Sequence, residues 1–200
     1  MNKHIKWVEK ACNKKDGTRP HLKELAYIDG RVMGTDGKRL HAWRGESDIV
    51  SPTGYPDVIG VIERAKAGQT TVTISKYHLI QTCNAVRALD KRNATVKMSV
   101  ADVLYCESSC NGDKVSVYIK DGDNWPGKST KVKYPQGKPH VVQYAKQGPG
   151  VYIALHPKYI IDALQGMDDV VTITFKGKHD PIYTQADDKE AVIMPMNMGR

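Results

Sequence analysis

Few residues with reactive side chains lie close enough in the sequence to suggest a catalytic centre. Cys106 and Cys110 are the only cysteines near one another, and a zinc site would need a second such pair, so we interpret all the cysteines as free thiols. Gly148 and Gly150 form a Gly-x-Gly pair, but a strand rather than a phosphate-binding helix is expected after it. The carboxylates at positions 168 and 169 are adjacent and would face opposite sides of a strand. We therefore predict that the protein is not an enzyme and holds no metal and no cofactor.

The charge balance favours a polyanionic partner. The 200 residues include 30 Lys and Arg against 22 Asp and Glu, which gives a net charge of +8. Nucleic acid is the commonest polyanion that such a basic protein meets. No segment is long and apolar enough to span a bilayer, and lysines interrupt the N-terminal residues where a signal peptide would have its apolar core. We therefore expect a cytoplasmic protein without a membrane partner.

Lysines recur along one side of the first predicted helix, which covers residues 2–15. Apolar residues at helical spacing occupy the opposite face. The apolar residues are Ile5, Val8 and Cys12. The lysines are Lys3, Lys6, Lys10 and Lys14. This stripe is either a solvated helix face, as lysine runs often are, or a surface for phosphates that reads charge and not sequence.

The hydrophobic pattern predicts an α+β fold with antiparallel sheets, in which a helix followed by strands occurs about three times. Helical spacing indicates helices over 2–15, 76–92 and 156–166. Asp29-Gly30 and Asp36-Gly37 indicate turns between strands. The polar, basic stretch at 123–140 is interpreted as a surface loop. The predicted strands cover residues 21–43 with its turns, 70–74, 94–100, 103–108, 114–120, 150–155, 170–177, 180–185 and 191–196.

An apolar run at residues 192–196 lies near the end of the sequence, where domains are usually loosest. Either this segment is a strand that closes a core, or its methionines are presented to a partner. Methionine suits both roles, because its flexible thioether fills irregular gaps and adapts to varied ligands.

Four stretches in order carry a resemblance to a known family. They are residues 18–22 (TRPHL) with 34–43 (GTDGKRLHAW), 54–62 (GYPDVIGVI), 156–164 (HPKYIIDAL) and 192–198 (VIMPMNM). Together they resemble the beta sliding clamp of bacterial DNA polymerase III over nearly the whole chain. The family's first domain and the second unit of its middle domain have no counterpart. The resemblance therefore implies a DNA-clamp-like fold, with a half domain at 1–54 and a complete domain at 55–200.

The resemblance also implies a function in DNA replication or repair. Clamps of this family are non-catalytic, and the basic faces of their helices point at double-stranded DNA, which assigns the lysine stripe to non-specific DNA binding. The family's C-terminal strand lines a pocket for peptides of the Gln-Leu-x-Leu-Phe type from polymerases and other DNA enzymes. Gly60 and Asn197 replace positions where the family often has arginine. Carried over residue by residue, the pocket contains Leu22, Thr35, Gly37, Arg39, Leu40, Pro56, Val61, His156, Tyr159, Pro181, Ile182, Val192, Ile193, Met194, Pro195 and Met196.

A half domain at 1–54 would leave the apolar face of its helix without cover. An exposed apolar face marks an interface, so we expect Ile5, Val8 and Cys12 to contact a second copy in a dimer, which could close into a tetrameric ring. The alternative is a monomeric or dimeric module that binds peptides, or competes with a host clamp, without encircling DNA. An enzyme with an unrecognised site is a third hypothesis, which turnover of a nucleotide or nucleic acid would support.

Overall fold

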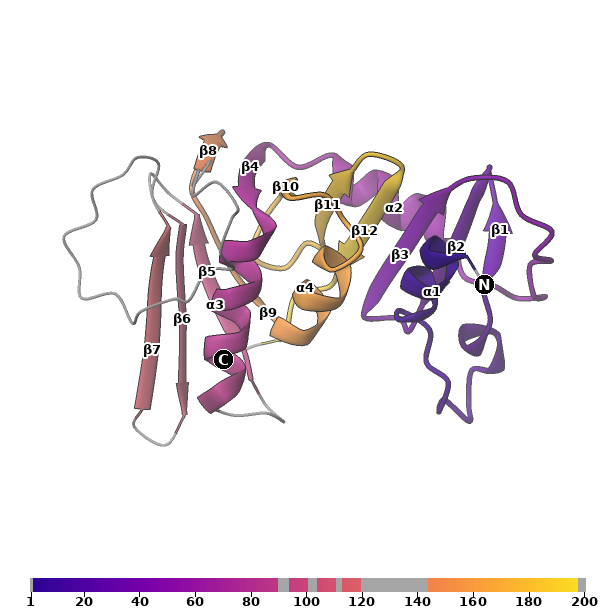
Figure 1. The fold of residues 1–200 in the computed structure, drawn as a ribbon, viewed down its shortest axis with the longest axis horizontal. Coiled ribbons are helices and arrows are strands. Elements are labelled where there is room, and N and C mark those ends of the chain that lie inside the picture. The colour runs from indigo at the N-terminus through magenta and orange to yellow at the C-terminus, as the bar shows by residue number, and fades with distance from the viewer. Residues whose placement is uncertain (1, 90–93, 101–103, 111–112, 120–143, 198–200) are drawn as a thin grey trace.

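The computed structural model describes residues 2–89, 94–100, 104–110, 113–119 and 144–197 (Figure 1). These residues form an α+β fold with antiparallel sheets, as predicted. The helices are α1 (Lys3–Glu9), α2 (Val58–Lys66), α3 (Lys76–Leu89) and α4 (Pro157–Leu164), with a 3-10 helix at Pro20–Lys23. The strands are β1 (Ala26–Ile28), β2 (Arg31–Thr35), β3 (Arg39–Arg44), β4 (Thr70–Ser75), β5 (Val96–Val100), β6 (Leu104–Cys110), β7 (Asp113–Ile119), β8 (Tyr144–Gln147), β9 (Val151–Leu155), β10 (Val170–Phe175), β11 (Ile182–Ala186) and β12 (Lys189–Ile193).

The helix-plus-strands pattern occurs three times in the described residues. α1 precedes β1–β3, α3 precedes β5–β7, and α4 precedes β10–β12. The helix starts have local causes. The Asp57 side chain accepts a hydrogen bond from the Gly60 backbone N–H at the start of α2, and Pro157 occupies the first turn of α4.

One large antiparallel sheet joins the two ends of the chain. Its strand order is β1-β2-β3-β12-β11-β10-β4-β8, so β3 from the first unit pairs with β12 from the last. The register places Arg39 opposite Ile193 and Leu40 opposite Val192. The first unit is thus attached to the rest of the chain by backbone hydrogen bonds. The boundary between the predicted half domain and complete domain stays a prediction.

The main core lies between the helices and both sheets. The smaller sheet has the order β7-β6-β5-β9, and α3 and α4 lie side by side in front of the sheets in Figure 1. Leu79 of α3, Leu164 of α4 and Met98 of β5 belong to one buried cluster. A second cluster forms beneath α2, where Val58 and Ile62 pack on side chains of β2, β3, β11 and β12. The large sheet therefore has α2 on one side and α1 and α4 on the other.

Four features differ from the sequence predictions. α1 ends at Glu9, not near residue 15, and β12 ends at Ile193, so residues 194–196 lie beyond the strand. α2 and β8 were not predicted. The predicted loop at 123–140 and strand residues 103 and 120 lie outside the described residues. Among the described residues, no helix has the length and hydropathy needed to cross a membrane.

The prediction that the first helix has an uncovered apolar face is wrong. Val8 is fully buried, Cys12 is buried, and only Ile5 is half-buried. α1 packs so closely on β2 that a Cβ atom on Gly34 would lie 2.8 Å from both the Cys12 Sγ and the Val8 carbonyl oxygen. The Trp7 indole N–H donates to backbone carbonyls of α4. The cover that we expected from a second copy comes from the same chain, because β3 and β12 bring the two parts together.

Candidate peptide and DNA interfaces

The surface formed by predicted pocket residues lies where β2 and β12 end and β3 begins. The turn between β2 and β3 is fixed by Thr35, whose Oγ1 accepts from the Gly37 N–H at 3.0 Å and donates to the Arg39 carbonyl at 2.6 Å. The Met194 N–H donates to the Lys38 carbonyl at 2.9 Å, so the C-terminal segment starts against this turn. Ile182 pairs with Ile193, which places Pro181 beside Met194. Segments far apart in sequence therefore form one surface.

Arg39 is the charged centre of this surface. Its side chain is buried, and its guanidinium contacts the carboxylates of Asp36 and Asp162 and donates to the Lys10 carbonyl. Burial alone would raise the pKa of Asp162, but hydrogen bonds from Lys158 and Arg39 outweigh it and hold that pKa below its ordinary value. The ion pairs tie the β2–β3 turn to α4.

Two aromatic rings of α4 and its cap lie beside Arg39. The Arg39 guanidinium carbon is 4.6 Å from the centre of the Tyr159 ring, a cation–π distance. The His156 and Tyr159 rings stack with centroids 4.7 Å apart. Burial raises the pKa of Tyr159 and, helped by the positive charge of Lys158, lowers that of His156. Both rings are therefore uncharged near neutral pH. Both are also half-exposed, so a ligand can contact them.

The C-terminal segment completes the surface on the other side of His156. The Met196 N–H donates to the Ala154 carbonyl at 2.8 Å, two residues before His156. Met194 is 38% exposed, the largest exposed apolar side chain of this segment, while Pro195 and Met196 are half-buried. Both explanations of the apolar run thus hold in part: residues up to Ile193 close the core, and Met194 is available to a partner.

The structure divides the predicted pocket residues between a buried floor and exposed walls. The buried members support the surface but offer a ligand little area. Leu40 and Val192 pack beneath α2 with Val61 at their edge, whereas Ile182 and Ile193 face the main core. The buried members are Leu22, Thr35, Arg39, Leu40, Ile182, Val192 and Ile193. The exposed or half-exposed members are Gly37, Pro56, Val61, His156, Tyr159, Pro181, Met194, Pro195 and Met196.

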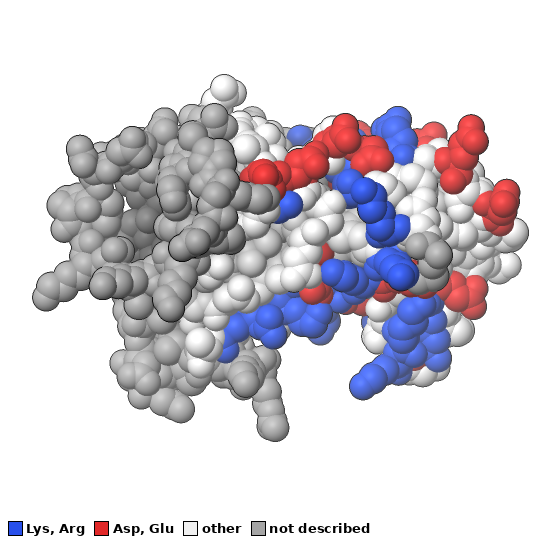
Figure 2. Space-filling view, viewed as in Figure 1, with Lys and Arg blue, Asp and Glu red and all other residues white. Residues whose placement is uncertain are grey.

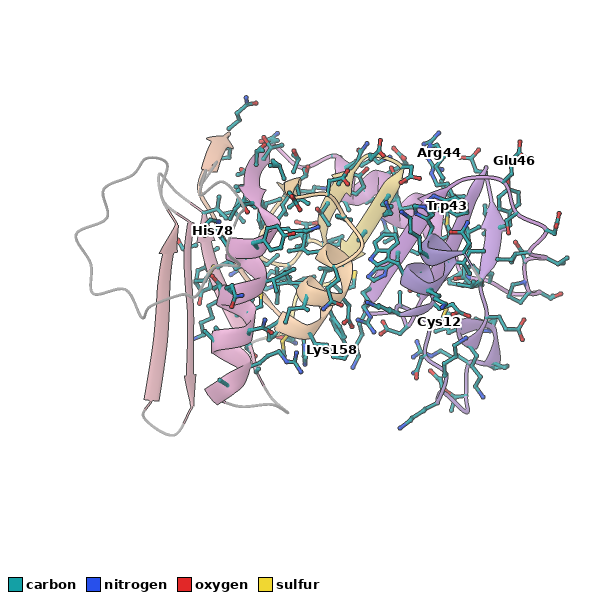
Figure 3. The ribbon with its side chains drawn as sticks, in the orientation of Figure 1. Cys12, Trp43, Arg44, Glu46, His78 and Lys158 are labelled. Atoms are coloured by element: carbon teal, nitrogen blue, oxygen red, sulfur yellow. The ribbon has the colours of Figure 1, made fainter. Side chains whose placement is uncertain are left out.

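The sequence analysis missed two residues of this surface, Lys38 and Asp162. Lys38 acts through its carbonyl, which no side-chain pattern reveals. Asp162 lies four residues after Lys158 on α4, a spacing at which opposite charges meet on a helix. The spacing of Lys158 and Asp162 was therefore the signal from which Asp162 could have been predicted. Lys158 lies at the lower end of α4 in Figure 3.

The predicted DNA-contacting lysines do not all lie on one helix face. Lys3 and Lys6 are exposed on α1, and Lys10 directly follows its last residue. Lys14 lies beyond the helix, and its Nζ is 3.6 Å from a Glu9 carboxylate oxygen. Lysine and arginine side chains gather in a band over α1 and beside α4, on the face that carries the helices (Figure 2).

Three cysteines lie in the core. Cys12, Cys83 and Cys106 are free and buried, and burial raises the pKa of the Cys12 thiol to about 11 and that of Cys106 to about 12. Such thiols are protonated and unreactive at neutral pH. No three His, Cys, Asp or Glu side chains are placed to hold a metal within the ranges that the structure describes.

Comparison with known proteins identifies the fold of this chain. No family model and no curated protein matches the sequence. Among solved structures, the DNA polymerase III beta subunit of Thermotoga maritima matches with a TM-score of 0.76 at 16% identity, over 98% of this chain and 63% of that chain. The chain has the fold of a bacterial sliding clamp.

Two other clamps match this chain to the same extent. The DNA polymerase III beta chain of Streptococcus pneumoniae gives a TM-score of 0.75 at 17% identity, over 98% of this chain and 62% of that one. The DNA polymerase sliding clamp of Bacillus subtilis gives 0.74 at 17% identity, over 98% and 61%. The chain thus spans less than two thirds of the length of each of these three clamps.

Proposed function

We propose that this protein is a non-catalytic, sliding-clamp-like accessory protein of DNA replication or repair in the cytoplasm. It binds duplex DNA without sequence preference and docks short peptides of polymerases or other DNA enzymes. The observation that carries the proposal is the pairing of β3 with β12, because it assembles Arg39, Tyr159 and Met194 from distant segments on one surface. The solved structures with this fold are themselves DNA polymerase subunits and sliding clamps.

The chemistry of the surface supports peptide docking. Tyr159 and Met194 provide apolar area that is partly exposed, and methionine adapts its shape to different side chains. The turn at 36–38 provides backbone groups that can orient an extended peptide. Aromatic rings in a partly desolvated surface are typical anchor points for a short peptide.

The charge distribution supports DNA binding. Lys3, Lys6 and Lys10 lie on the helix-bearing face, where basic side chains gather (Figure 2). Lysine binds phosphate as a point charge, and phosphate contacts carry no sequence information. This surface therefore fits contacts that are the same for every DNA sequence.

A dimer through α1 is not part of the proposal, since the apolar side of that helix is covered. The edge strand β1 is also partly covered, because the Ser51 hydroxyl accepts from the Tyr27 N–H at 3.0 Å and donates to the Tyr27 carbonyl at 2.8 Å. The second candidate function is a clamp-like peptide-binding module that does not encircle DNA.

Duplex binding at several salt concentrations separates the two functions. Short labelled duplexes of unrelated sequence should bind with the same affinity. That affinity should fall steeply between about 50 mM and about 200 mM salt, because each phosphate contact releases a counterion. Absence of duplex binding together with retained peptide binding would reject the DNA-binding function and favour the peptide-binding module.

A further inference from the structure

A partly open cavity of about 340 Å³ lies between α1 and the turn that follows α4. The first wall carries Lys3, Lys6 and Lys10, and the second carries Gln165 and Asp168. Lys189, from the start of β12, closes the remaining side. The Lys10 Nζ donates to the Gln165 side-chain oxygen at 2.9 Å, which fixes the distance between the two walls. This cavity is separate from the surface around Tyr159.

The cavity has a strong excess of positive charge. Four lysines line it against one carboxylate, that of Asp168. Lys189 contacts Asp188 at 3.1 Å, but within the described part of the chain no ion pair reaches Lys3 or Lys6. A concave surface with one sign of charge concentrates the field and attracts a counter-ion of opposite sign.

The size of the cavity restricts its ligand. Its volume is near the lower limit for pockets that hold small molecules, about 300 Å³. A DNA duplex is far wider than the cavity and can contact these lysines only from outside it. A compact anion with several charges would match them all.

The floor of the cavity argues against recognition of a base. Trp7 lines it, but its side chain is only 4% exposed, and one face of its indole stacks on the buried His41 ring at 4.5 Å. Its N–H is occupied by carbonyls of α4. Since the indole offers no free face of useful area, affinity must come from the lysines, which bind phosphate oxygens as point charges.

We propose that this cavity is a binding site for a diphosphate or triphosphate group, either free or as the tail of a nucleotide. Lys3, Lys6, Lys10 and Lys189 hold the phosphate oxygens, and the exposed Gln165 amide donates its N–H groups to them. The inference does not depend on the proposed function, because it concerns a small anion and not a duplex or a peptide.

Calorimetric titration of the full chain at constant ionic strength tests the site, with inorganic pyrophosphate as the probe. The variant Lys6→Ala/Lys10→Ala should bind at least about tenfold more weakly, since two charge-assisted hydrogen bonds are lost. Lys176→Ala/Lys178→Ala is the matched control, because both lysines are exposed and away from the cavity, and it should bind as the parent does.

The sign of the electrostatic effect gives a second test. Asp168→Asn removes the one negative charge of the cavity and should strengthen pyrophosphate binding by about threefold, as expected for one charge in a partly exposed site. Weaker or unchanged binding of pyrophosphate to Asp168→Asn would contradict the proposal. Because Asp168 is exposed, the substitution should leave the fold intact.

Parallel titrations with dATP distinguish the two sources of the ligand. Equal affinities for pyrophosphate and dATP support a site that reads phosphates alone, and tighter dATP binding supports a nucleotide as the ligand. If the parent binds neither, or the Lys6/Lys10 variant binds as the parent does, the proposal is overturned. Duplex binding measured on the same proteins would be unaffected by that failure, so the proposed function would stand or fall separately.

Discussion

The Arg39 guanidinium carbon lies 4.6 Å above the Tyr159 ring, although the two residues come from opposite ends of the chain. Arg39 starts β3 and Tyr159 belongs to the first turns of α4. Arg39 also pairs with Asp162 and donates to the Lys10 carbonyl at the end of α1. One buried side chain therefore connects three elements at the candidate peptide surface.

Replacing Arg39 should destabilise the fold. Arg39→Met should lower the free energy of unfolding by about 3 kcal/mol, because it leaves the largely buried Asp162 carboxylate with one fewer partner. Urea unfolding followed by circular dichroism measures the change. Arg44→Met is the control, since Arg44 is exposed at the other end of the same strand, beside Trp43 (Figure 3). Equal stability of the two variants would show that the Arg39 contacts contribute nothing.

Peptide binding should depend on Tyr159 and Met194. The double variant Tyr159→Ala/Met194→Ala should bind a labelled Gln-Leu-x-Leu-Phe peptide about tenfold more weakly, as expected when anchor contacts are lost. Fluorescence anisotropy measures the affinity, and circular dichroism checks that the variant is folded. Val50→Ala serves as control, because Val50 is 85% exposed and away from this surface. Unchanged affinity of the folded double variant would place the site elsewhere.

The lysines of the first unit should differ in their effect on DNA binding. Lys6→Ala should weaken duplex binding for every sequence and reduce the salt slope by about one unit. Lys14→Ala should have a smaller effect, because Lys14 lies past the end of α1 beside Glu9. The matched pair removes one positive charge in each case. If Lys6→Ala and Lys14→Ala reduce the salt slope equally, duplex binding depends on the net charge of the protein and not on the α1 face.

Acid should destabilise the protein through His41. Burial, with the nearby positive charge of Arg39, lowers the pKa of His41 from 6.5 to about 4, while its Nδ1–H donates to the Trp7 carbonyl. Between those pH values the unfolded chain binds a proton that the folded chain does not, so stability is full above pH 6.5 and falls as the pH decreases. From about pH 7 to about pH 5 the loss should be about 2 kcal/mol.

His41→Phe is the matching variant for this pH effect. It keeps the stacked ring but removes the titrating group, so it should be less stable at neutral pH and show a smaller change on acidification. Denaturant unfolding of parent and variant at both pH values gives the comparison. An identical pH dependence in the two proteins would assign the effect to other groups, such as His156, whose pKa is also lowered.

Local patterns in the sequence predicted most elements correctly. The turns at Asp29-Gly30 and Asp36-Gly37 have glycines with positive φ, +69° at Gly30 and +83° at Gly37, which is why those dipeptides mark the ends of strands. Periodicity located α3 and α4 within a few residues. α2 was not predicted, although Asp57 as N-cap and the spacing of Val58, Ile62 and Ala65 were available signals.

The errors arose where distant residues decide the structure. The helical pattern of the first unit continues to Cys12, but α1 ends at Glu9, and the carbonyl of Lys10 accepts from Arg39. Similarly, the apolar run at the C-terminus continues past Ile193, where β12 ends. The backbone N–H groups of Met194 and Met196 donate instead to the carbonyls of Lys38 and Ala154. The burial of the apolar face of α1 could not be predicted for the same reason, because no local pattern reveals that β3 pairs with β12.

The affinity of the parent chain for a clamp-binding peptide tests the central claim most directly. Calorimetry with a Gln-Leu-x-Leu-Phe peptide should give one site per chain with a Kd of about 1 µM to about 1 mM, the range in which short peptides bind partly exposed apolar surfaces. A peptide of the same composition in reversed order should bind at least about tenfold more weakly. Equal binding of the two peptides, or no binding of either, would contradict the assignment of a peptide-docking surface at Arg39, Tyr159 and Met194.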